Sequence, residues 1–118
     1  MATFSQTVRL ESLDGERSVE IDALVDTGAS YTLVPANLMA DLGVEPIDTV
    51  RLALADGRPV VDPIGRAVAT IDGRTENTLV AFGENDARPL LGAYTLEGLR
   101  LAVDPAVGRL VPGSGYTL

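Results

Sequence analysis

The residues most able to carry out a chemical reaction are Asp26, Thr27 and Gly28, which directly follow the apolar run Ala23-Leu24-Val25. An extended, largely apolar pattern resumes over residues 29–34. The pattern predicts a buried strand that breaks into a tight turn, since Gly28 can adopt a positive φ and the Thr27 hydroxyl can bond inward. Because a carboxylate is costly to place among apolar residues, this position favours a functional Asp26 over an ordinary turn aspartate.

Composition limits the chemistry that Asp26 can perform. The 118 residues include no histidine and no cysteine. This excludes Ser-His and Cys-His nucleophile systems, thiolate zinc sites and most transition-metal sites, so the sequence predicts neither a metal nor a cofactor. Two carboxylates that share a proton remain able to hydrolyse an amide. One takes a proton from the attacking water while the other protonates or polarises the carbonyl.

The chain offers one such carboxylate where the chemistry needs two. No second Asp-Thr-Gly or Asp-Ser-Gly occurs in the sequence. Asp14, Asp56 and Asp72 each precede a glycine, but strand patterns on both sides predict hairpin turns there. A twofold axis through the site would bring two copies of Asp26 together. We therefore expect a homodimer.

Charge and hydropathy restrict the partners. The net charge is −8, from 17 acidic and 9 basic residues, which argues against nucleic acid because its phosphates would be repelled. The first six residues lack the basic and apolar regions of a signal peptide, and no apolar run is long enough to cross a bilayer. The expectation is a cytoplasmic protein without a membrane partner.

The elements that must position Asp26 are mostly strands, separated by glycine-bearing turns. Alternating patterns predict strands at 7–13, 18–25, 50–55, 58–61, 65–71, 78–82, 99–103 and 109–111, and short helices at 35–42 and 94–98. This order predicts a mostly-β, closed barrel with one or two short helices. A single domain is expected over residues 1–118, with its core at about 7–111 and a tail at 112–118.

The chain resembles the retropepsin-like aspartic proteases, the single-lobed homodimeric relatives of pepsin, over roughly residues 7–111. One part of the resemblance is residues 23–30, which include the Asp-Thr-Gly. A second is Leu90-Leu91-Gly92, two apolar residues and a glycine, where Gly92 lies 92 − 26 = 66 residues after Asp26. The pattern over residues 33–43 is similar to that of prokaryotic members.

The resemblance implies a role for each matching residue. Asp26 would be the catalytic acid and base, one from each chain. The catalytic loop would be supported by Thr27, Gly28, Ala29, Leu91 and Gly92. Thr27 would bond across the dimer and Gly28 would offer its N–H to the carboxylates. The flap that closes over an extended peptide substrate would have its tip at Ala55, Asp56, Gly57 and Arg58.

Two departures from the family pattern concern the flap and the dimer. The flap tip has one glycine, Gly57, and Pro59 stiffens one arm. Residues 104–108 do not match the viral terminal strand, which leaves the strands of the dimer interface open. The expected function is that of an aspartic endopeptidase that cleaves peptide bonds with a water activated between two Asp26 carboxylates. The alternative is a retropepsin-like dimeric module that binds peptides with weak or no proteolysis.

Overall fold

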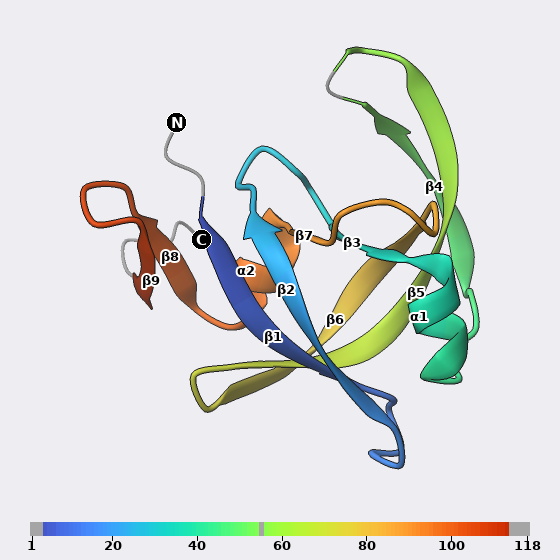
Figure 1. Cartoon of the computed structure of the whole chain (residues 1–118), viewed down its shortest axis with the longest axis horizontal. Coiled ribbons are helices and arrows are strands. Elements are labelled where there is room, and N and C mark those ends of the chain that lie inside the picture. The colour runs from blue at the N-terminus through green and yellow to red at the C-terminus, as the bar shows by residue number, and fades with distance from the viewer. Residues whose placement is uncertain (1–3, 55, 114–118) are drawn as a thin grey trace.

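The computed structural model describes residues 4–54 and 56–113. These form nine strands and two short helices (Figure 1). The strands are β1 (Ser5–Glu11), β2 (Ser18–Val25), β3 (Thr32–Pro35), β4 (Asp48–Ala53), β5 (Pro59–Ile71), β6 (Arg74–Gly83), β7 (Leu90–Leu91), β8 (Leu101–Asp104) and β9 (Arg109–Pro112). The helices are α1 (Ala36–Asp41) and α2 (Ala93–Gly98). The mostly-β class with two short helices is therefore as predicted.

The main sheet closes on itself. Its seven strands have the order β1-β2-β7-β3-β6-β5-β4, and β1 also pairs with β5, with Leu10 opposite Ala69. This extra pairing joins the two sides of the sheet into a ring and leaves β4 outside it. Strands β8 and β9 form a separate hairpin beside the ring (Figure 1). Closure agrees with the predicted closed architecture.

The hydrophobic core consists mainly of side chains that point from the strands into the ring. The predicted alternation is confirmed in β1, where Val8 and Leu10 are buried, and in β2, where Ile21 and Ala23 are buried. Further core side chains come from the helices and the segments after them, namely Met39, Leu42, Leu96 and Leu99. Burying each large apolar side chain contributes about 1.5–3 kcal/mol, so the core fixes β2 and the residues that follow it.

Strand β5 differs from the prediction, which placed two short strands, at 58–61 and 65–71, on either side of Asp62-Pro63-Ile64. It runs unbroken through this segment. At Pro63 the strand pairs with β4, and its ladder with β6 begins one residue later, so a residue without an N–H is tolerated. Gly65 serves a close approach, since a Cβ there would lie 3.0 Å from the Glu45 carbonyl oxygen.

The remaining boundaries differ by a few residues. Pro35 ends β3 opposite Gly83, and α1 begins one residue later than predicted. Strand β1 begins and ends two residues earlier, which leaves Leu13 exposed in the β1–β2 turn. The expected tail at 112–118 lies outside the described residues from 114 on. Neither helix in the described ranges is long and apolar enough to cross a membrane.

Candidate active site

Strand β7 places the loop that carries Asp26. It lies between β2 and β3, parallel to β2, with Leu91 opposite Val25, and antiparallel to β3, with Leu90 opposite Leu33. Since neighbouring strands lie about 4.8 Å apart, the loop at 26–31 must cross about 10 Å, past the end of β7, to reach β3. The chain leaves the core at Asp26 and re-enters it at β3.

Backbone hydrogen bonds hold this loop on the segment that follows β7. The Asp26 N–H donates to the Leu91 carbonyl oxygen at 3.0 Å, which extends the β2–β7 pairing by one bond. The Ala93 N–H donates to the Ala29 carbonyl oxygen at 2.8 Å, and the Tyr94 N–H donates to the Ser30 carbonyl oxygen at 3.0 Å. Three bonds thus join the loop to β7 and the first turn of α2.

The Asp26 carboxylate is fixed by its own turn. Its Oδ1 accepts the Gly28 N–H at 2.9 Å, and the Ala29 N–H donates to the Asp26 carbonyl oxygen at 3.1 Å. Asp26 is partly buried, whereas Thr27 and Gly28 are exposed. A single chain therefore buries Asp26 less than its apolar flanks predict, because the loop stands at the end of the ring rather than inside it.

Gly92 packs against the far end of the loop. A Cβ at this position would lie 2.4 Å from the Tyr31 carbonyl carbon, 2.5 Å from the Tyr31 carbonyl oxygen and 2.9 Å from the Thr32 nitrogen. The φ of Gly92 is −97°, which any residue can adopt, so the backbone contact alone requires glycine here. Leu91 and Gly92 thus both contact the loop directly.

Three buried threonines beneath the loop were not predicted from the sequence. The Thr32 and Thr95 hydroxyl oxygens lie 2.6 Å apart, and those of Thr78 and Thr95 lie 2.8 Å apart. Thr32 also accepts the Gly92 N–H at 3.1 Å. No sequence signal could have found this cluster, because its members come from β3, β6 and α2 and isolated threonines are ordinary residues in strands.

Tyr31 and Tyr94 form an aromatic pair beside the loop. Their ring centroids are 5.9 Å apart with the planes tilted by 44°. Tyr31 is partly buried and Tyr94 is exposed. Both therefore pack at the rim of the loop.

The proposed flap is the hairpin of β4 and β5. Figure 1 shows that this green hairpin extends beyond the ring at the same end of the molecule as the loop after β2. Gly57 has a φ of +87°, and the Leu54 N–H donates to the Arg58 carbonyl oxygen at 2.9 Å, which closes the turn. Ala55, the first residue of the predicted tip, lies outside the described residues.

Asp56 organises this turn. Its Oδ1 accepts the Arg58 N–H at 2.9 Å, and its Oδ2 accepts the Arg58 Nε–H at 2.7 Å. The backbone hydrogen bond from Arg58, followed by its side-chain bond, lowers the pKa of Asp56 below the ordinary 3.8. A lowered pKa means that the carboxylate stabilises the turn above its ordinary pKa, and that this stabilisation is lost as the pH falls through the lowered value.

We expect Arg58→Ala to raise the pKa of Asp56 part of the way to its ordinary value, because the backbone bond stays while the guanidinium is lost. An NMR pH titration of the Asp56 carboxyl carbon measures this change. Arg51→Ala, an exposed arginine on the β4 arm, is the matched control and should leave the midpoint unchanged. An identical midpoint in the wild type and Arg58→Ala would contradict the claim that the Arg58 side chain helps to lower the pKa of Asp56.

Within residues 4–54 and 56–113, no second aspartate lies in an equivalent place. As predicted, Asp14, Asp56 and Asp72 lie in the β1–β2, β4–β5 and β5–β6 turns. Among the described residues, no group of three or more acidic, histidine or cysteine side chains gathers as metal ligands would. Of the aspartates in the part of the chain that the structure describes, Asp26 alone follows a buried strand and enters the loop beside β7.

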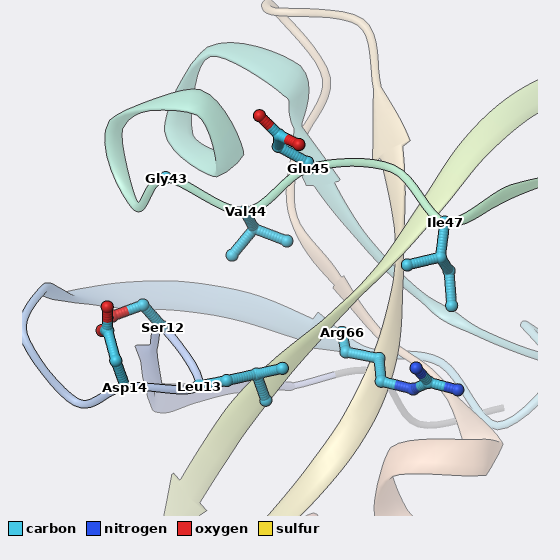
Figure 2. A pocket seen from close by; sticks show the side chains of 8 residues that line it. All are labelled: Ser12, Leu13, Asp14, Gly43, Val44, Glu45, Ile47 and Arg66. Carbon is cyan, nitrogen blue, oxygen red and sulfur yellow. The ribbon is translucent and has the colours of Figure 1, made fainter.

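A pocket of about 280 Å³ lies at the opposite end of β2 and is not part of this site (Figure 2). Leu13, Val44, Ile47 and Arg66 are among its lining residues, which come from the β1–β2 turn, the segment after α1, and β5. Strand β2 has eight residues at about 3.3 Å each, so more than 20 Å separates this end from Asp26.

Comparison with known proteins agrees with this geometry. Residues 8–95 match the aspartyl protease family model. The solved structure of simian foamy virus (mac) protease matches with a TM-score of 0.52 and 21% identity, over 78% of this chain and 92% of that chain. A retropepsin-like aspartic protease from Rickettsia conorii matches with a TM-score of 0.51 and 21% identity, over 87% and 88%.

A third similar structure is Lpg0085 from Legionella pneumophila, a protein of unknown function, with a TM-score of 0.52 and 14% identity over 87% of this chain and 92% of that one. Comparison with curated proteins found no significant match. At these identities the solved structures show a shared fold, and the family model covers most of the chain. The chain therefore belongs to the aspartyl protease family and has a retropepsin-like fold.

Proposed function

We propose that this chain is an aspartic endopeptidase that acts as a homodimer, with one Asp26 from each chain in a shared dyad. The observation that carries the proposal is the position of Asp26, held by the Gly28 N–H where β2 leaves the core beside β7. Membership of the aspartyl protease family supports a peptidase function. The catalytic loop would be Asp26 to Ala29, supported by Leu91 and Gly92.

The proposed dimer follows from the chemistry. Amide hydrolysis by this route needs two carboxylates that share one proton, and the chain has one aspartate in such a loop. The exposed Thr27 and Gly28 are available for contact with a second chain. A partner that covers this loop would also exclude water from Asp26, which strengthens electrostatic interactions there.

In the proposed reaction, the ionised Asp26 takes a proton from a bound water, and the water oxygen bonds to the carbonyl carbon of the substrate. The protonated Asp26 of the other chain donates its proton to the carbonyl oxygen, which gives a tetrahedral diol. The first Asp26 then gives its proton to the amide nitrogen, the C–N bond breaks, and the other Asp26 takes a proton from one hydroxyl of the diol. The products are a carboxylic acid and an amine, and the dyad again holds one proton.

The β4–β5 hairpin would act as the flap over an extended peptide. Its β4 arm ends at Leu54, an apolar side chain that is 40% exposed and lies on the same face of the hairpin as Leu52 and its ladder partner Val60. In a closed state this face could cover apolar substrate side chains, while the peptide backbone binds as an added strand. Asp56, Gly57 and Arg58 would keep the turn at the flap tip ordered.

The proposal is tested by measuring molecular mass and cleavage of a peptide library across a range of protein concentrations. We expect cleavage per chain to fall on dilution in parallel with the dimer fraction, because a separated chain holds half of the dyad. Full activity in samples that are monomeric by mass would contradict the shared dyad. A dimer that binds library peptides without cleaving them would instead identify a peptide-binding module.

A further inference from the structure

We propose that Thr95 is a positioning residue for Asp26, acting through the first turn of α2. The inference rests on the proposed catalytic role of Asp26. The buried cluster of Thr32, Thr78 and Thr95 holds the loop that carries this carboxylate in a fixed position relative to the core.

Thr95 is the centre of the cluster. Of the three threonines, it is the one whose hydroxyl bonds to both of the others, at 2.6 Å to Thr32 and 2.8 Å to Thr78. Thr32 and Thr95 are 1% exposed and Thr78 is 4% exposed, so water does not replace these bonds. Their geometry matters because a buried hydroxyl without a partner is costly.

The cluster connects the three elements around the end of the loop. Thr32 is the first residue of β3 and directly follows the loop, Thr78 lies in β6, and Thr95 lies in α2. Thr32 also accepts the Gly92 N–H, which joins the cluster to the β7–α2 connection. The start of β3 and the start of α2 are thereby tied to the same strand of the ring.

The first turn of α2 carries this constraint to the loop. The N–H groups of Ala93 and Tyr94 donate to the carbonyl oxygens of Ala29 and Ser30, which lie three and four residues after Asp26. Loss of the Thr95 hydroxyl would remove the side-chain bonds that join this turn to Thr32 in β3 and to Thr78 in β6. Its two bonds to the loop would then move with it, and the Asp26 carboxylate would be held less accurately.

An accurately held carboxylate affects turnover more than binding. Displacement of a catalytic group by about 1 Å can cost about 100-fold in rate. Most substrate contacts expected from the flap and from strand addition lie away from Thr95. A positioning role therefore predicts a fall in kcat per folded enzyme with little change in KM, whereas a role confined to general stability leaves kcat per folded enzyme unchanged.

The test compares Thr95→Val, which keeps the volume but removes the hydroxyl, with Thr95→Ser, which keeps the hydroxyl. Thr75→Val is the matched control, since it breaks a hydroxyl pair with Thr70 at 2.8 Å near the exposed β5–β6 turn. We expect kcat to fall about 10- to 100-fold in Thr95→Val, with KM within about threefold of the wild type. Thr95→Ser should restore most of kcat, and Thr75→Val should leave it unchanged.

Amide hydrogen exchange gives a readout that does not depend on activity. In Thr95→Val, exchange at the Ala93 and Tyr94 amides should accelerate at least about tenfold more than exchange at Val8 in the β1–β2 pair, because the opening is local. Should Thr95→Val not fold, Thr78→Val removes one bond of the cluster and should show smaller changes in the same direction.

Three results would overturn the proposal: unchanged kcat and unchanged local exchange in Thr95→Val and Thr78→Val, equal effects in Thr75→Val, or failure of Thr95→Ser to restore most of kcat. If the wild type cleaves no peptide, the proposed function fails. The exchange measurements would then still decide whether Thr95 holds the loop.

Discussion

Replacing Asp26 with asparagine should abolish peptide cleavage, with a loss of about 10³-fold or more in kcat. Asparagine has nearly the same shape as aspartate but cannot take a proton from water, and general acid–base catalysis contributes about 10²- to 10⁴-fold. Because both chains of the proposed dimer carry the change, no intact dyad remains. Initial rates on the best library peptide, with mass measured in the same samples, test this expectation.

The matched control for this variant is Asp22→Asn. Asp22 lies on the same strand, four residues earlier, and is exposed. Asp22→Asn removes the same negative charge as Asp26→Asn but leaves the loop unchanged, so the activity of this variant should equal that of the wild type. Equal cleavage by Asp26→Asn and the wild type would remove Asp26 from the chemistry.

Gly92→Ala should destabilise the fold by about 3 kcal/mol or more. The added methyl would lie 2.4 Å from the Tyr31 carbonyl carbon, and these are backbone atoms that cannot rotate away. Overpacking of a tight site typically costs about 1–3 kcal/mol, and a backbone clash belongs at or above the upper end. Urea unfolding followed by circular dichroism measures the change, and cleavage by the folded fraction should also fall because the loop must shift.

Gly98→Ala is the control for this prediction. Gly98 ends α2, and a Cβ there would meet no atom within 4 Å. Alanine has a higher helix propensity than glycine, so this variant should be neutral or slightly more stable. Unfolding of Gly92→Ala and Gly98→Ala at the same urea concentration would contradict the claim that Gly92 lies too close to Tyr31 to carry a side chain.

Much of the fold could be predicted from local patterns. The alternation in β1 and β2 and the Asp-Gly turns defined the hairpins, since the period of two and the turn residues act over a few positions. The break predicted at residues 62–64 was wrong, since β5 runs through them. Pro63 is tolerated because the ladder with β6 begins one residue later, and Gly65 allows the close approach of Glu45; both depend on tertiary contacts.

The candidate site was predictable in part, again where a local sequence pattern carries the signal. Asp26 is a candidate because of its apolar flanks, and Gly92 because of the resemblance to a family pattern. The position of β7 between β2 and β3 could not be predicted, because a strand of two residues has no periodic pattern in the sequence. The threonine cluster could not be predicted either, because Thr32 and Thr95 are 63 residues apart in the sequence and come together only when β3 and α2 pack in the fold.

A crystal structure of the protein with a statine-type transition-state mimic tests the central claim most directly. The measured quantity is the distance between the Asp26 carboxylates of neighbouring chains. The proposed dyad predicts a symmetric dimer in which these carboxylates lie about 3 Å apart and both contact the hydroxyl of the mimic. A mimic bound to a single chain, or a dimer with its two Asp26 carboxylates far apart, would contradict the shared dyad.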